Sequence, residues 1–189
     1  MSSKSGTDEE ALAARVALLV KEKEHNRITD AIRAERRALP MVLVMKSYTF
    51  QSPNGTITLK DLLVTKSQLI IYHFMFEPIA EEGCQGCAFM AANFPDLLHL
   101  ADKDTALAVV SRAQIYKIAP YKERDPWRFP RVSTNGSDFN YDFQVTLDEK
   151  VAHVEYNFQP KEKLDVNIAG EQPGLSVFKL EDGQVYHIY

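Results

Sequence analysis

A nearly continuous apolar run, Leu69-Ile70-Ile71-Tyr72-His73-Phe74-Met75-Phe76, constrains the fold of this chain more than any other segment. The run lacks the alternation of polar and apolar residues that is typical of a strand with one face in water. A strand of this kind is covered on both faces, as in the middle of an α/β sheet. We therefore predict a central strand over residues 68–76, with His73 as a hydrogen-bonded core residue rather than a proton donor.

Two cysteines follow this strand in the motif Cys84-Gln85-Gly86-Cys87. The motif should open a helix over residues 88–100, which Pro95 must kink or restart. In a chain with only two cysteines, this spacing indicates catalysis, redox sensing or metal binding. A structural zinc site needs four ligands, and the histidines of the chain have no recognisable ligand spacing. We predict neither a metal nor a cofactor, and a motif without activity remains an open alternative.

Thiol–disulfide exchange would assign different roles to the two thiols. The thiolate is the nucleophile, and the free backbone N–H groups at a helix start favour that anion. By position, Cys84 would attack a disulfide, and Cys87, one turn further on, would resolve the mixed disulfide. Glu77, Glu81 and Glu82 lie just ahead of Cys84 and would oppose the thiolate wherever their side chains approach it.

The elements on either side of the motif predict the fold class. A hairpin over Tyr48–Leu59 turns at Asn54-Gly55, which is a strong hairpin signal, ahead of the central strand. After the motif come a strand over Ala106–Val110, a helix from Gln114 to about residue 123 and a final hairpin from Leu175 onward. This order, with cysteines at the start of the first helix, resembles the α/β thioredoxin fold. The extra leading hairpin resembles that of peroxiredoxin-like members, so we predict a thioredoxin-like fold with both features.

Residues 1–40 are predicted to form an N-terminal helical extension, and residues 41–189 the thioredoxin-like domain. Thr7 or Asp8 should cap a helix that ends before Pro40, because the residue before a proline avoids the helical region. The single apolar stripe of this helix needs a partner, since an isolated helix gains little stability from propensity. We expect the half near Pro40 to pack on its own domain and the far tip to reach a second subunit, which predicts a homodimer through this helix.

The composition and the termini exclude several classes of partner. The chain has 22 Lys and Arg against 26 Asp and Glu, a formal charge of −4, which predicts no nucleic-acid partner. No apolar run reaches the ~18 residues of a membrane span, and the N-terminus lacks the apolar stretch of a secretory signal. We therefore expect a cytoplasmic protein without a membrane partner.

Four further residues are candidates for substrate binding: Arg112, Trp127, Tyr141 and Pro173. Arg112 follows the second buried strand, at the end where α/β sheets place their sites, and suits a thiolate or an acidic substrate. Its neighbour Ser111 forms a capping-box pattern with Gln114, so Ser111 is predicted to cap a helix. Trp127 and Tyr141 belong to aromatic segments that either line a pocket or cover the sheet. Pro173 precedes the last hairpin, where thioredoxins carry a cis-proline, and both isomers remain open.

Several long motifs resemble one family: Glu35–Pro40, Tyr72–Phe76, Glu82-Gly83-Cys84 with Cys87, Ser111–Ala113, Trp127–Pro130 and Gly136–Phe143. In this order they are similar to domain-of-unknown-function family 899, whose members are described as thioredoxin-like predicted dithiol–disulfide oxidoreductases. The resemblance implies that activity for Cys84 and Cys87. Members of the family usually continue past the final hairpin, so we expect the C-terminal tail of the family to be missing from this chain.

Together these features predict an oxidoreductase that exchanges a Cys84–Cys87 disulfide with thiols of a protein or a small molecule. Two alternatives belong to other classes of protein. One is a thioredoxin-fold binding or scaffold protein with dispensable cysteines, since Gly83 stands where thioredoxins carry a tryptophan. The other is a small-molecule enzyme of secondary metabolism that uses the aromatic segment as a pocket.

Reduction of hydrogen peroxide should be slow. Peroxiredoxins carry Pro-x-x-x-Thr-x-x-Cys, whereas Glu77 and Glu81 occupy the proline and threonine positions ahead of Cys84. The hydroxyl that would orient a peroxide is therefore absent from the motif. A peroxidase assay with a thiol reductant should give a kcat/KM well below ~10⁴ M⁻¹s⁻¹, the low end of ordinary enzyme efficiency. A value approaching that level would contradict the prediction.

Overall fold

The N-terminal part of the chain is one long helix. A computed structural model describes residues 5–120, 128–164 and 168–189, and it divides the chain into two compact units, Met1–Pro40 and Met41–Tyr189. The first unit holds α1, Asp8–Arg37, which Thr7 caps. The Thr7 hydroxyl accepts the N–H of Glu10 at 3.3 Å, and the Glu10 carboxylate accepts the N–H of Thr7 at 2.8 Å. This capping box satisfies donors that a helix start leaves unpaired. The helix-mediated homodimer stays a prediction.

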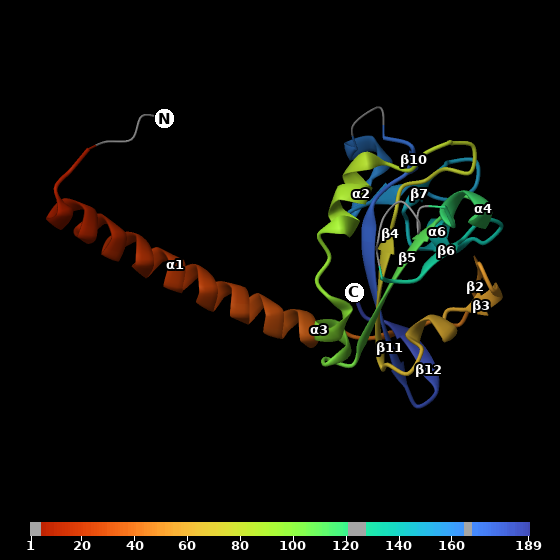
Figure 1. The fold of residues 1–189 in the computed structure, drawn as a ribbon, viewed down its shortest axis with the longest axis horizontal. Coiled ribbons are helices and arrows are strands. Elements are labelled where there is room, and N and C mark those ends of the chain that lie inside the picture. The colour runs from red at the N-terminus through yellow and green to blue at the C-terminus, as the bar shows by residue number, and fades with distance from the viewer. Residues whose placement is uncertain (1–4, 121–127, 165–167) are drawn as a thin grey trace. The chain divides into compact units, whose positions relative to one another are not determined.

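The second unit is built on one sheet. Among the described residues, eight strands pair in the order β1-β12-β11-β4-β5-β6-β2-β3 (Figure 1). Their bounds are β1 Val42–Leu43, β2 Thr49–Ser52, β3 Gly55–Thr58, β4 Gln68–His73, β5 Thr105–Ser111, β6 Arg131–Ser133, β11 Gly174–Glu181 and β12 Gln184–His187. Two short ladders stand apart from this sheet: β7 Thr146–Leu147 with β10 Gly170–Glu171, and β8 Glu155–Tyr156 with β9 Gln159–Pro160.

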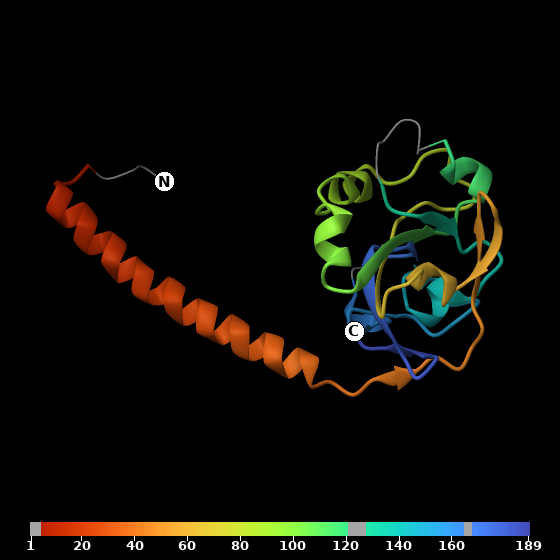
Figure 2. The same ribbon diagram turned by 60° about the horizontal axis from the view of Figure 1, so that its bottom comes forward.

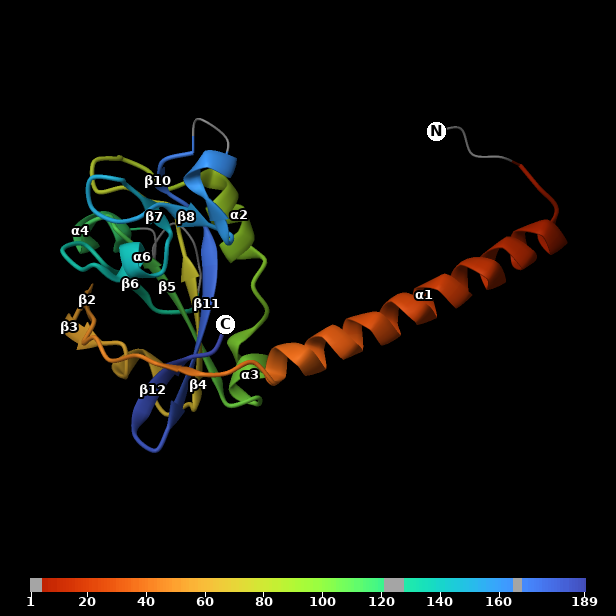
Figure 3. The ribbon, with the colours of Figure 1, turned by 180° about the vertical axis from the view of Figure 1, so that it is seen from behind.

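Short helices surround the sheet. They are α2 Gln85–Ala92, α3 Leu97–Ala101, α4 Ile115–Ile118 and α6 Phe139–Asp142, with 3₁₀ turns η1 Asp61–Leu63 and η2 Lys161–Lys163. α2 and α3 lie on one face of the central strands and α6 on the other (Figures 1 and 3). No helix in the described part of the chain combines the length and the apolar character needed to cross a membrane.

β4 is the centre of the sheet, as the apolar run predicts. It pairs antiparallel with β11, where Gly174 lies opposite His73, and parallel with β5, where Val110 lies opposite His73. Because side chains alternate along a strand, β4 contributes to both layers of the core. Leu69 and Ile71 belong to the layer that contains Phe139 and Phe178. Tyr72 belongs to the opposite layer, with Cys87 and Ala91 of α2.

The two predicted hairpins are confirmed. β2 and β3 turn at Asn54-Gly55, where Gly55 adopts a φ of 114° that suits glycine. Figure 2 shows this hairpin, in gold, along the edge of the sheet. β11 and β12 form the final hairpin. The predicted helix over residues 88–100 is interrupted before α3, whose N-cap Asp96 follows Pro95. This order of elements agrees with the predicted thioredoxin-like fold.

One local prediction is wrong, and several short strands, β6 among them, were not predicted. Ser111 caps no helix: it is the last residue of β5, and its carbonyl accepts the N–H of Thr134 at 2.8 Å. Gln114 occupies the N-cap position of α4. The short strand β6 forms because β5 extends far enough to pair with it, through Val110 opposite Val132. Of the helix predicted from Gln114 to residue 123, α4 ends at Ile118, and residues 121–127 lie outside the described residues.

Candidate active site at the start of α2

The two cysteines stand at the first turn of α2, after the loop over residues 74–83 that follows β4. Cys84 is the N-cap residue, and its backbone N–H donates to the Met75 carbonyl at 2.9 Å. This bond ties the helix start to the segment that follows the central strand. Both thiols are free; Cys84 is partly exposed, whereas Cys87 is only 3 % exposed. The two side chains contact each other, so one accessible thiol lies beside one buried thiol.

Glycines on either side of Cys84 leave room for the sulfur and for an aromatic ring. A Cβ on Gly83 would collide with the ring of Phe74, so a larger residue there would displace the loop. A Cβ on Gly86 would lie 3.7 Å from the Cys84 Sγ atom. The missing side chain at Gly86 therefore leaves one side of the sulfur open to an incoming molecule.

Two tyrosines face the buried thiol, and the sequence analysis identified neither of them. Tyr72, on β4, is a hydrogen-bond partner of the Cys87 thiol. Tyr156, on β8, interacts electrostatically with Cys87, and Figure 3 shows β8 next to α2. Burial raises the pKa of the Cys87 thiol, and the contact with Tyr72 lowers it in part. The buried thiol therefore ionises less readily than a free cysteine.

Lys117 of α4 holds the loop that leads to Cys84. Its ammonium group donates to the carbonyls of Pro78 and Ala80 at 3.2 and 2.8 Å and contacts the Glu81 carboxylate at 3.2 Å. An ammonium group has three donors, so these contacts account for all of them. Of the carboxylates expected to oppose the thiolate, Glu81 is therefore paired with Lys117, and Glu77 lies beside Gly170.

Pro173 lies at the same end of the sheet, immediately before β11. No peptide bond in the described residues is cis, so the cis-proline alternative is wrong and the bond is trans. The Tyr156 hydroxyl donates to the Pro173 carbonyl at 2.8 Å. This carbonyl is thus engaged within the protein, and Tyr156 connects Pro173 to the surroundings of Cys87.

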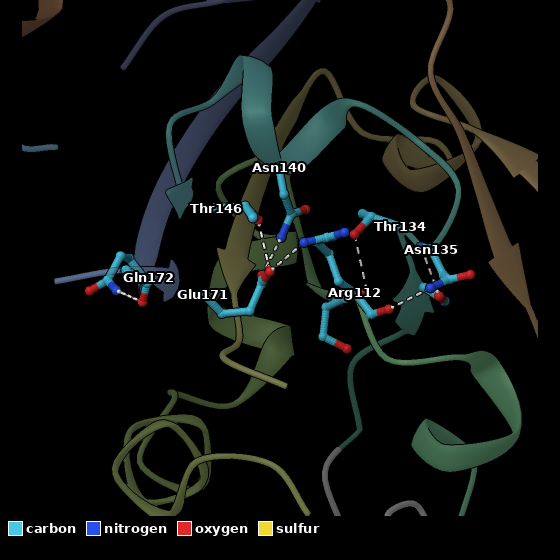
Figure 4. A network of polar contacts seen from close by, with 10 residues as sticks. Arg112, Thr134, Asn135, Asn140, Thr146, Glu171 and Gln172 are labelled. Carbon is cyan, nitrogen blue, oxygen red and sulfur yellow. Dashed lines mark hydrogen bonds and ion pairs between the residues drawn. The ribbon is translucent and has the colours of Figure 1, made fainter. Parts of the chain in front are cut away.

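Arg112 takes part in a polar network around Glu171 (Figure 4). Glu171 is 4 % exposed, and its Oε1 atom accepts from Arg112 at 3.1 Å and from Thr146 at 2.9 Å. Its Oε2 atom accepts from Asn140 at 3.0 Å. The Arg112 guanidinium also lies over the Tyr141 ring, 4.8 Å from its centroid. The structure thus brings Arg112 and Tyr141 together, and their role in substrate binding stays a prediction.

The aromatic segments divide between the two layers of the core. Phe129 packs with the α2 side of the sheet, whereas Phe139 and Phe143 pack on the opposite side. Trp127 lies outside the described residues. The described rings therefore cover the two faces of the sheet. This agrees with the interpretation that the aromatic segments cover the sheet rather than line a pocket.

His73 points away from the cysteines, into the layer opposite α2. Its Nε2 atom is 2.9 Å from the Ser176 hydroxyl, and its ring stacks on Phe139. Burial lowers the pKa of His73 to about 3, so the ring is neutral in the folded protein. This confirms a core histidine. No group of three or more His, Cys, Asp or Glu in the described residues is arranged to hold a metal ion.

Comparison with solved structures places the fold of this chain among thioredoxin-like folds. The bacterioferritin comigratory protein of Xanthomonas campestris matches with a TM-score of 0.50 and 16 % identity, over 80 % of this chain and 88 % of that chain. A cysteine-to-serine mutant of peroxiredoxin Q from Xanthomonas campestris matches with a TM-score of 0.50 and 17 % identity, over 80 % and 87 %. A protein assigned as the thiol:disulfide interchange protein DsbE from Chlorobium tepidum matches with a TM-score of 0.47 and 11 % identity, over 79 % of this chain and 86 % of that chain.

The two Xanthomonas campestris structures confirm the predicted thioredoxin-like fold. The chain belongs to the family described as "Bacterial protein of unknown function (DUF899)", whose model matches residues 1–189. The resemblance found in the sequence motifs is thereby confirmed. Comparison with curated protein sequences gives no match.

The reduced protein should be alkylated at Cys84 first. Cys87 is buried and its thiol pKa is raised, so we expect labelling of Cys84 to be at least about tenfold faster near neutral pH. Raising the pH should increase labelling of Cys87, because more of its thiolate forms. Mass analysis of peptides after timed alkylation measures both rates, with the denatured protein as the control. Equal labelling rates for the two cysteines of the folded protein, or no labelling of either cysteine, would contradict the prediction.

Removal of the Glu171 carboxylate should destabilise the fold strongly. Glu171→Ala leaves the partly buried Arg112 without its carboxylate, and we expect the free energy of unfolding in urea to fall by about 3 kcal/mol. Glu181→Ala, which breaks the more exposed pair with Lys179, is the control and should cost less than about 1 kcal/mol. Equal losses for the two variants would show that burial of the network is unimportant.

Proposed function

We propose that this protein is a thiol–disulfide oxidoreductase, with Cys84 as the nucleophile and Cys87 as the resolving thiol. The observation that carries the proposal is the pairing of an accessible thiol at the N-cap of α2 with a buried thiol in the first turn. The structural neighbours support it only through their fold, because their sequence identity is low.

The exchange reaction balances as two successive sulfur displacements. The Cys84 thiolate attacks one sulfur of a substrate disulfide, a Cys84–substrate disulfide forms, and the other substrate sulfur leaves as a thiolate that takes a proton from water. Cys87 then loses its proton to water and attacks the Cys84 sulfur. The Cys84–Cys87 disulfide forms, the second substrate thiolate leaves, and the substrate has gained two electrons. The reverse sequence oxidises a dithiol by the same steps.

The surroundings of the two sulfurs suit these displacements. Gly86 leaves the approach to Cys84 open, and the bond from Cys84 to Met75 fixes the helix start against the sheet. Lys117 holds the preceding loop, so the entry to the sulfur has a defined shape. Cys87 is shielded, which restricts it to attack on a disulfide already attached to its neighbour.

Trapping of a mixed disulfide tests the proposal. A Cys87→Ser variant should accumulate a disulfide between Cys84 and its substrate, because the resolving thiol is absent. The variant is exposed to a bacterial lysate and to a defined disulfide, oxidised glutathione, and adducts are identified by mass spectrometry without reductant. The Cys84→Ser variant and the double variant are the controls and should trap much less. If the wild type exchanges with no disulfide and Cys87→Ser forms no adduct, the protein is instead a binding or scaffold protein of this fold.

A further inference from the structure

The resolving thiol is placed where ionisation is difficult. Cys87 must become a thiolate to attack, yet its side chain is almost fully buried in the layer beneath α2. Among the described residues, the titratable groups that face it are Tyr72 from β4, Tyr156 from β8 and Cys84 from the start of its own helix. None of these is a cation that would stabilise the anion. Within the described residues, hydrogen-bond donors are therefore the groups that stabilise the Cys87 thiolate, namely the Tyr72 hydroxyl and the backbone N–H of Met75.

Tyr72 is held in a fixed orientation beneath α2. The residue is 5 % exposed, and its ring meets the rings of Phe74 and Phe94 edge to face, with centroids 6.4 and 5.2 Å apart. Buried tyrosine hydroxyls require a hydrogen-bond partner, and the Cys87 thiol, buried in the same core layer, is a partner of the Tyr72 hydroxyl. The Tyr156 hydroxyl, in contrast, donates to the Pro173 carbonyl. Tyr72 is thus the tyrosine whose donor is directed at the sulfur.

We propose that Tyr72 is a catalytic hydrogen-bond donor, which stabilises the Cys87 thiolate both as attacking group and as leaving group. This inference rests on the proposed thiol–disulfide exchange. During resolution Cys87 gives its proton to water, while Tyr72 keeps its own proton and donates a hydrogen bond. In the reverse direction an incoming thiolate attacks Cys84, the Cys84–Cys87 bond breaks, and Cys87 leaves as a thiolate that Tyr72 again stabilises. Burial raises the pKa of Tyr72 above its usual range, so the hydroxyl is protonated throughout.

A chromogenic aromatic disulfide separates the two chemical steps. Reaction of reduced protein with 5,5′-dithiobis(2-nitrobenzoate) releases one coloured thiol when Cys84 attacks and a second when Cys87 resolves the adduct. Tyr72→Phe removes only the hydroxyl, and we expect the second release to slow about tenfold, because a hydrogen bond to a charged group is lost. The first release should be unchanged. Tyr116→Phe, at a 67 % exposed tyrosine of α4, is the matched control and should change neither step.

A second measurement is independent of any exchange activity. In a Cys84→Ser background, the pH midpoint of Cys87 alkylation reports ionisation of that thiol alone. Adding Tyr72→Phe should move the midpoint up by about one pH unit, and adding Tyr156→Phe should move it less. An unchanged midpoint together with an unchanged second release would overturn the role of Tyr72 while the proposed function stands. Absence of a second release from the wild type would instead refute the proposed function. Urea unfolding of each variant verifies that the fold is intact.

Discussion

The pairing of β4 with β11 on one side and β5 on the other positions Tyr72 and the start of the segment that leads to the cysteines. A strand that is paired on both edges and covered on both faces has a fixed register, because a shift by one residue would turn each side chain to the wrong layer. This register directs Tyr72 toward α2 and His73 toward the opposite layer. The bond from the Phe74 N–H to the Val110 carbonyl, at 2.8 Å, extends the constraint beyond the end of the strand. The start of α2 is therefore held against a rigid part of the sheet.

A network of buried polar groups lies beyond the end of the central strand β5. Glu171 joins the end of β5, the helix α6 and the ladder β7–β10 through Arg112, Asn140 and Thr146. Burial still raises the pKa of the Glu171 carboxyl, which means that desolvation outweighs the donors around it. The network thus fixes how these segments pack together. Burying the ionised carboxylate lowers the free energy of unfolding relative to burying the protonated form. That decrease is absent below the ordinary carboxyl pKa and grows as the pH rises through the raised value.

The sequence was sufficient for features that depend on neighbours along the chain. The apolar run of β4, the Asn54-Gly55 turn and the restart of the helix after Pro95 all follow from local rules, and they define the fold class. Contacts between segments that are distant in the chain are not indicated by any local sequence pattern. β6 is too short to show a period, and Ser111 satisfies a capping pattern although β5 runs through it. Within the site, the motif identified the two cysteines. The unbroken apolar run of β4 gave no sign of which face Tyr72 occupies, and only the packing of α2 shows that Cys87 lies in the same layer as Tyr72.

The connection between β4 and α2 has a consequence for how the length of this chain can change in evolution. Three sets of hydrogen bonds hold the segment from Phe74 to Cys84. The Phe74 N–H donates to the Val110 carbonyl, the Cys84 N–H donates to the Met75 carbonyl within the segment, and Lys117 of α4 donates to two carbonyls between them. An inserted or deleted residue within it would break at least one of these attachments and rotate the cysteines relative to the sheet. The described part of the segment between β7 and β10 holds the short β8–β9 ladder and the turn η2, and this ladder lies outside the main sheet. Insertions should therefore accumulate between β7 and β10, while the spacing of the last β4 residue from the first cysteine stays constant.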